Sequence, residues 1–223
     1  MRDAIVLAAL LVVSGGALAA RPQAPSKPAR EVAAALQKKY DTIRDFTADF
    51  VHNYESGMLH KKLSERGTVR VKKPGKMRWD YKSPDTKLFV SDGLRIYSYV
   101  PADNQVIVSP VPPEDQATTA VLFLVGKGNL TRDFTVTYAQ GGIDTTYALR
   151  LEPRLPERDY DWLQLVVDRA SLQFRELTAA DKQGGRSTFV FSNFKENVGL
   201  ADKIFAFKIP RGADVITSGS PSR

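Results

Sequence analysis

The side chains that could carry out chemistry are few and lie far apart along this chain. Its two histidines, His52 and His60, are eight residues apart on either side of Gly57, and no cluster of carboxylates adjoins them. That spacing does not match a metal site, so both are expected to be ordinary strand or surface residues. Glu157 and Asp159 are close in sequence, but they lie in a charged stretch typical of a solvated loop.

The sequence also lacks the motifs of the common enzyme classes. No G-x-S-x-G nucleophile elbow, no phosphate-binding loop of the Walker type, no G-x-G-x-x-G and no H-E-x-x-H zinc motif occurs. Cysteine is absent, so neither a thiolate nucleophile nor a disulfide is available. We therefore expect a binding protein that is not an enzyme and that needs no metal or cofactor.

Bulk composition predicts one soluble domain with a basic surface. The chain of 223 residues is 43% hydrophobic and 26% charged, and its formal net charge is +7. That length supports a single hydrophobic core. No run of Lys and Arg exceeds three residues and no aromatic RNA-binding strand motif occurs. Nucleic acid is therefore not an expected partner. We expect the protein to be a monomer.

The stretch that must position any binding surface runs from Gly67 to Pro110. Segments rich in Val, Ile, Phe, Tyr and Trp alternate there with turn residues, at spacings of about ten residues. This pattern predicts antiparallel strands joined by tight turns. Met77, Trp79 and Tyr81 fall on one face of such a strand. That face is expected to border an apolar interior, either an ordinary core or a ligand-lined cavity.

Further strands and two helices complete the predicted fold. Strands are expected from Phe46 to Tyr54 and from Lys62 to Lys72, and five more alternating segments follow from Asp133 onward. An amphipathic helix is predicted from Arg30 to Arg44 and an apolar one from Glu114 to Val125. A sheet of about eleven twisted strands must curl, and the two helices are its natural cover.

The two ends of the chain are predicted to lie outside this domain. An unbroken apolar run from Ala4 to Val13, followed by small residues at Ala17 and Ala19, is the pattern of a secretory signal peptide. We expect cleavage near Ala19 and, because no cysteine can carry a lipid, an exported protein without a lipid anchor. The predicted parts are a signal peptide at 1–19, a flexible leader at 20–29, a single domain at 30–216 and a disordered tail at 217–223.

Four segments of the chain form a distinctive series. They are the helix with Leu36 and Tyr40 that leads into Phe46-Thr47-Ala48-Asp49-Phe50; Val71-Lys72-Lys73-Pro74 followed by Trp79; Leu88-Phe89-Val90-Ser91-Asp92-Gly93 followed by Tyr97 and Tyr99-Val100-Pro101; and the helix ending Leu122-Phe123-Leu124-Val125-Gly126. In their order and spacing these segments resemble the outer-membrane lipoprotein carrier protein family, LolA. After Asp133 only the rhythm of the strands agrees.

The resemblance implies a fold, a function and partners. The family's fold is mainly β with α: an incomplete, unclosed antiparallel β-barrel of about eleven strands, covered by an α-helical lid. Its members are periplasmic chaperones that accept acylated lipoproteins from an ATP-driven transporter of the inner membrane and pass them to an outer-membrane acceptor. The acceptor shares the fold but needs an N-terminal cysteine, so this chain resembles the carrier. A periplasmic lipid-sensing regulatory domain and a carrier of a different lipid remain alternatives.

The expected ligand lining consists of large apolar side chains on the strand faces and the two helices. It comprises Tyr40, Phe46, Phe50, Met77, Trp79, Tyr81, Phe89, Ile96, Leu122, Phe123, Leu149, Leu165 and Phe191. In many members of the family, an arginine before the motif's proline ties the barrel to the lid. The matching residue here is Lys73, which still donates hydrogen bonds but lacks the planar guanidinium. Lys73 is therefore the predicted lid latch; a solvated turn residue there, with Arg70 or Arg78 as the latch, is the alternative.

Overall fold

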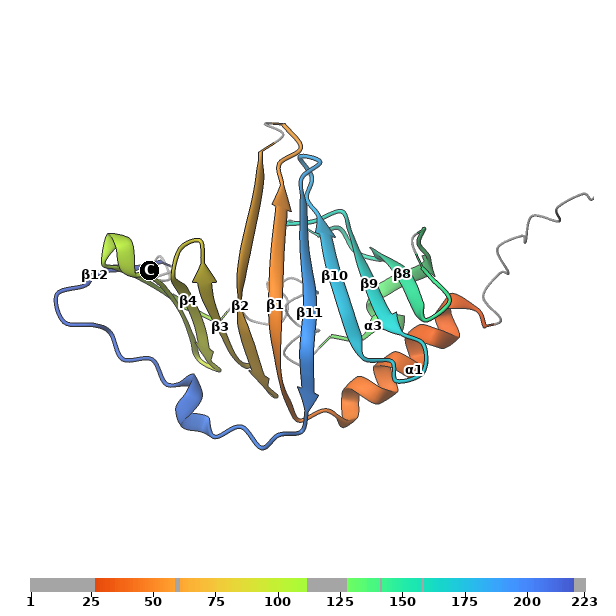
Figure 1. Cartoon of the computed structure of the whole chain (residues 1–223), viewed down its shortest axis with the longest axis horizontal. Helices are drawn as coiled ribbons and strands as arrows, with labels where there is room; N and C mark the ends of the chain where they lie inside the picture. Colours follow the sequence, from red (N-terminus) through yellow and green to blue (C-terminus); the bar gives the residue numbers. More distant parts are fainter. Residues whose placement is uncertain (1–26, 59–60, 112–127, 141, 158, 219–223) are drawn as a thin grey trace, which may run out of the picture.

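One sheet of twelve strands organises the chain (Figure 1). The computed structural model describes residues 27–58, 61–111, 128–140, 142–157 and 159–218. Across the sheet the strand order is β12-β6-β5-β4-β3-β2-β1-β11-β10-β9-β8-β7, so β12 and β7 form its edges and it does not close on itself. Figure 1 shows β1 and β11 at the centre, with the two halves of the sheet spreading to either side.

The helices and strands have the following bounds. The strands are β1 (Asp45–Glu55), β2 (Lys62–Lys72), β3 (Lys76–Ser83), β4 (Lys87–Asp92), β5 (Arg95–Val100), β6 (Gln105–Pro110), β7 (Phe134–Tyr138), β8 (Thr146–Pro153), β9 (Trp162–Asp168), β10 (Phe174–Ala180), β11 (Arg186–Glu196) and β12 (Asp214–Thr217). The helices are α1 (Ala29–Thr42), α3 (Leu130–Asp133) and the short 3-10 turns η1 (Pro101–Asp103) and η2 (Asp202–Phe205).

This architecture confirms the predicted mainly-β, unclosed half-barrel and corrects some of its details. The sheet has twelve strands instead of about eleven, and β12 pairs with β6 in parallel, whereas the other neighbours are antiparallel. Thr217, the first residue of the predicted tail, is the last residue of β12. Helix α1 begins at Ala29, inside the predicted leader. The predicted helix 114–125, the predicted signal peptide and His60 lie outside the described residues.

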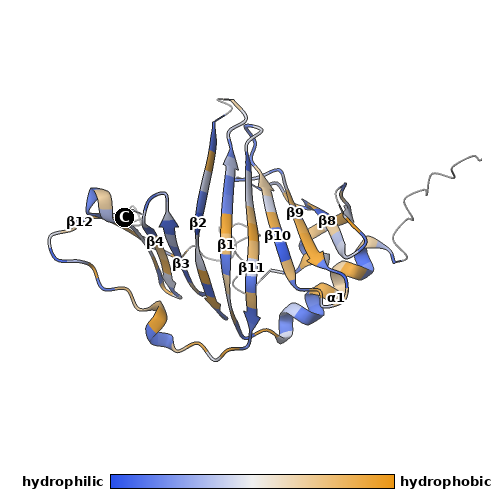
Figure 2. Ribbon diagram, viewed as in Figure 1, coloured by the Kyte–Doolittle hydropathy of each residue, from blue (hydrophilic) through white to orange (hydrophobic). Residues whose placement is uncertain are grey.

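Helix α1 covers part of one face of the sheet, which we call the inner face. Its apolar stripe of Val32, Leu36 and Tyr40 recurs at helical spacing and is at most 2% exposed. The Tyr40 ring meets that of Phe174 on β10 edge to face, with ring centres 5.3 Å apart. Figure 2 shows the corresponding division of α1 into apolar and polar sides. The main core therefore lies between α1 and the inner face of the sheet.

A second apolar layer lies on the opposite, outer face of β4, β5 and β6. Val90 and Val106 are fully buried there, although neither belongs to the core beneath α1. They are covered by the segment that follows β11, in which Phe205 is 1% exposed and Phe207 packs 5.2 Å from the Tyr97 ring. This half of the sheet is thus apolar on both faces. No helix in the described ranges is long and apolar enough to cross a membrane.

Candidate ligand-binding face

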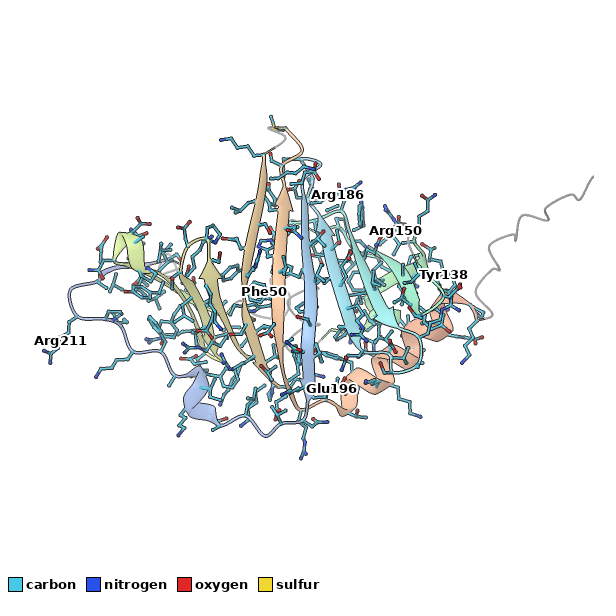
Figure 3. All side chains as sticks on the ribbon, in the orientation of Figure 1. Phe50, Tyr138, Arg150, Arg186, Glu196 and Arg211 are labelled. Atoms are coloured by element: carbon cyan, nitrogen blue, oxygen red, sulfur yellow. The ribbon has the colours of Figure 1, made fainter. Side chains whose placement is uncertain are left out.

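An aromatic cluster occupies the centre of the inner face. Phe50 on β1, labelled in Figure 3, contacts Trp79, Tyr81 and Phe189 with ring centres 5.1, 4.9 and 5.9 Å away. The strand register explains this meeting, because Gly67 on β2 lies between Phe50 and Tyr81. A Cβ atom at Gly67 would lie 2.7 Å from the Phe50 ring, so only glycine leaves the space that the ring fills.

The structure divides the predicted lining residues into two groups. Seven are buried in the core with exposed fractions of 8% or less: Tyr40, Phe46, Phe50, Tyr81, Leu149, Leu165 and Phe191. Four are half-buried on the inner face: Met77, Trp79, Phe89 and Ile96. Leu122 and Phe123 lie outside the described residues. The half-buried group forms an apolar surface on β3, β4 and β5 that is backed by the aromatic cluster.

Lys73 joins the β2–β3 turn to the end of α1. Its Nζ atom donates a hydrogen bond to the backbone carbonyl of Tyr40 and lies 3.4 Å from the centre of the Tyr40 ring. The backbone N–H of Lys73 also donates to the Arg44 carbonyl at 2.9 Å. Burial lowers the pKa of Lys73 to about 8, and the charge of Asp41 partly opposes this. An ammonium in this position satisfies a carbonyl at the helix end and makes a cation–π contact.

The alternative latch residues are engaged elsewhere. Arg70 and Arg78 project from the outer face and both bind the carboxylate of Asp80, at 2.7 and 2.9 Å. Arg78 also donates to the carbonyl of Ile204 at 3.3 Å, in the segment after β11. Of the three basic side chains, Lys73 is therefore the one that the structure places against α1.

A polar cluster adjoins the aromatic cluster on the inner face. Glu65 on β2 is buried; its carboxylate accepts a hydrogen bond from Lys87 Nζ on β4 and lies 3.2 Å from Nδ1 of His52. Nε2 of His52 lies 2.8 Å from the Ser187 hydroxyl, and its ring stacks on Phe189 at 4.1 Å. Burial lowers the pKa of His52, although Glu65 opposes that shift. Within the described ranges no group of three or more His, Asp or Glu residues could hold a metal ion.

A cleft of about 760 Å³ lies on the outer face of the same strands. Its basic lining consists of the outward-facing Arg70 and Arg78 together with Lys82 and Lys203, and the cleft also reaches Lys87, whose ammonium is bound to Glu65 on the inner face. Asp80 is its one acidic residue among those described. Leu88 and Tyr99 add apolar surface. Arg78 and Asp80 flank Trp79 in β3, so this cleft and the apolar surface around Trp79 occupy opposite faces of one strand.

Comparison with known proteins assigns the chain to a family. The model of the family described as outer membrane lipoprotein carrier protein LolA matches residues 41–208, from the last turn of α1 to the segment before β12. The chain belongs to the LolA family.

Relatives within the LolA family match most of the chain. An outer-membrane lipoprotein carrier protein of Chromohalobacter salexigens is 30% identical over 211 residues, which cover 95% of this chain and 97% of the relative. The one of Methylibium petroleiphilum is 33% identical over 192 residues, covering 82% and 91% of the two chains. An uncharacterized conserved protein from Thermus thermophilus has a similar fold, with a TM-score of 0.52 at 13% identity over 85% of this chain and 98% of the other.

Two features of this LolA-family inner face were missed from the sequence. Phe189 contacts both Phe50 and Trp79 yet was not predicted, although it lies two residues from Phe191 on the same strand face. The period of two could have identified it. No local sequence pattern indicated the polar cluster, because His52, Glu65 and Lys87 lie on three different strands and are brought together only by the register of the sheet.

Proposed function

We propose that this chain is a periplasmic chaperone that shields the acyl chains of lipoproteins on its inner face and carries them to the outer membrane. The observation that carries this proposal is the half-buried apolar surface of Met77, Trp79 and Phe89 above the aromatic cluster. The names of the LolA-family relatives, outer-membrane lipoprotein carrier proteins, support it. The proposed activity is binding and release, without a chemical step.

The energetics of the cargo explain why such a face is needed. Each methylene exposed to water costs about 0.8 kcal/mol, so the acyl chains of a lipoprotein cost on the order of tens of kcal/mol. Aromatic and aliphatic side chains bind such chains without directional contacts. A surface that is only half-buried offers this attraction reversibly, which is what a carrier requires.

We further propose that α1 is a fixed wall of the binding face and that Lys73 is its latch. The apolar stripe of α1 is packed into the core, and moving it away would expose Val32, Leu36 and Tyr40 to water. Lys39 also links α1 to the sheet, because its Nζ donates a hydrogen bond to the Ser171 carbonyl at 2.7 Å and lies 2.9 Å from the Glu196 carboxylate on β11. We therefore expect α1 to stay in place when cargo binds.

Partners and export are part of the same proposal. We infer that the signal peptide pattern directs export, with cleavage near Ala19, that an ATP-driven inner-membrane transporter supplies the cargo and that an outer-membrane lipoprotein accepts it. Lys72 and Lys76, two of the basic residues in the β2–β3 turn region, bind Asp202 of this chain. The basic cleft of the outer face, which contains Lys82 and Lys203, is a better candidate for an acidic partner surface.

A lipoprotein-release assay tests the carrier function. Spheroplasts that synthesise a radiolabelled lipoprotein are incubated with the purified mature protein, and the soluble fraction is examined for a one-to-one complex. We expect release by the wild type. Because a carboxylate in an apolar site costs several kcal/mol, we expect Trp79→Asp to release on the order of tenfold less or lower still.

The second tryptophan provides the matched control. Trp162 lies on the outer face of β9, where its ring stacks with the Arg150 guanidinium at 4.4 Å. Trp162→Asp should therefore release lipoprotein as the wild type does. Equal loss in both variants, or full activity of folded Trp79→Asp, would contradict the assignment. Binding of free lipid with lipoprotein left on the membrane would favour a lipid sensor or the carrier of another lipid.

A further inference from the structure

The polar cluster lies where the apolar part of the inner face ends. Along β1, Phe46, Ala48 and Phe50 face inward and are buried, and the next inward residue is His52. Its neighbour on β2 is Glu65, and Lys87 reaches Glu65 from β4 across the Tyr81 ring. The cluster is therefore continuous with the proposed acyl-binding surface through Tyr81 and Phe189.

A charged group at this place needs compensation, and the cluster provides it. Glu65 is buried, and an unpaired carboxylate there would be strongly unfavourable. Lys87 supplies the opposite charge and His52 a second contact. The three side chains differ in exposure: 5% for Glu65, 15% for His52 and 27% for Lys87. Lys87 is therefore the most exposed member of the cluster.

The Lys87 ammonium retains hydrogen-bonding capacity. An ammonium has three donors and no acceptor, and in the described part of the chain its hydrogen bond goes to Glu65. The groups that complement it are acceptors without a proton to donate, such as ester carbonyl oxygens. In a lipoprotein whose cysteine bears a diacylglyceryl group, esters join the two acyl chains to the glyceryl group, so the polar linkage immediately follows these apolar chains.

We propose that Lys87 binds the ester carbonyl oxygens of acylated cargo, and that Glu65 and His52 position its ammonium at the end of the apolar face. This inference rests on the proposed function and extends it from the acyl chains to their linkage. The cluster thereby fixes the depth to which the chains enter, because the ester oxygens must reach Lys87. Hydrocarbon alone would not satisfy this donor.

A comparison of two synthetic lipopeptides tests the inference. Both carry a cysteine bearing a glyceryl group with two sixteen-carbon chains, linked in one through esters and in the other through ethers that lack the carbonyl oxygens. We expect the wild type to bind the ester form roughly tenfold more tightly, as for a charge-assisted hydrogen bond. Lys87→Met should abolish this preference, so that the ester and ether forms bind with equal affinity.

Further variants separate binding from a merely structural role. Lys87→Arg keeps a cationic donor and should retain a preference for the ester form. Glu65→Gln removes the charge that positions Lys87 and should reduce the preference without weakening the ether form. Lys82→Met, which changes an exposed lysine on β3, is the matched control and should behave as the wild type.

Each contrary outcome has a definite meaning. Equal affinity of the wild type for the two lipopeptides would overturn the role of Lys87 but not the carrier function. The role of Lys87 is equally overturned if Lys87→Met weakens both forms to the same extent or weakens neither. If the wild type bound neither lipopeptide, the proposed acyl-binding function would fail, and the inference would fail with it.

Discussion

Lys73 shows how one side chain joins a turn of the sheet to the end of a helix. The sequence placed a cationic donor before Pro74, and the structure brings that donor to the Tyr40 carbonyl and ring. The resemblance indicated a cationic latch residue at this position, but it did not indicate which groups surround that residue. Burial sets the pKa of Lys73, and it depends on how α1 packs over the β2–β3 turn.

The titration of Lys73 gives a prediction for this residue. Burial lowers the pKa of Lys73 from 10.5 to about 8 in the folded protein. Between these values the unfolded chain binds a proton that the folded protein lacks, so the contribution of Lys73 to stability rises as the pH increases from about 8 to 10.5. Arginine stays charged over this range, so the wild type should gain stability relative to Lys73→Arg.

Urea unfolding at a series of pH values measures this difference. The free energies of unfolding of wild type and Lys73→Arg should run parallel below about pH 8 and diverge above it, with the wild type becoming relatively more stable. Lys82→Arg at an exposed position is the control. A difference that stays constant up to pH 10.5 would show that Lys73 does not lose its proton on burial.

The segment after β11 is the element that local sequence patterns described least well. It crosses β3 and β4, buries Phe205 on their outer face and ends in β12, paired with β6. No strand was predicted from the sequence for Asp214–Thr217, which forms the end of this segment. Its partner lies about a hundred residues earlier in the chain, and pairing over such a separation leaves no periodic signal.

Strands in which apolar and polar residues alternate strongly were predicted well. The bounds of β2, Lys62–Lys72, agree with the sequence, and β3 presents Met77, Trp79 and Tyr81 on the predicted face. The four-residue helix α3 is too short for a helical period to appear. In β4, Phe89 and Val90 are packed on opposite faces because the segment after β11 supplies a second cover.

Asp45 gives a prediction for this element. Its buried carboxylate accepts hydrogen bonds from the backbone N–H groups of Val198, Gly199 and Leu200, at 2.7, 3.1 and 3.3 Å. Asp45→Ala removes these three hydrogen bonds to a charged acceptor, so we expect a loss of stability on the order of 2–4 kcal/mol. Hydrogen exchange should show faster exchange in residues 197–205 than in the wild type.

The exposed Asp103→Ala variant is the matched control for Asp45, since it removes a carboxylate from η1 at the far edge of the sheet. Its exchange in residues 197–205 should equal that of the wild type. Unchanged protection of this segment in Asp45→Ala would show that the aromatic contacts of Phe205 and Phe207 hold it without help from the carboxylate.

The molecule as a whole separates two kinds of surface on the two faces of one sheet. The inner face carries the apolar surface around Trp79, and the outer face carries the basic cleft beside the segment after β11. In this arrangement a partner protein can dock on the outer face while cargo stays on the inner one. The resemblance predicted the half-barrel, but the outer cleft depends on the path of the segment after β11 and was not predictable locally.

Neighbouring residues of β4 test the central claim most directly, because Phe89 faces inward and Leu88 faces the outer cleft. A photo-reactive benzoylphenylalanine is placed at either position, and the protein is loaded from spheroplasts whose lipoproteins carry radiolabelled acyl chains. Irradiation should attach the label from position 89 and not from position 88. Equal labelling from both positions, or labelling from position 88 alone, would contradict the account that acyl chains lie on the inner face.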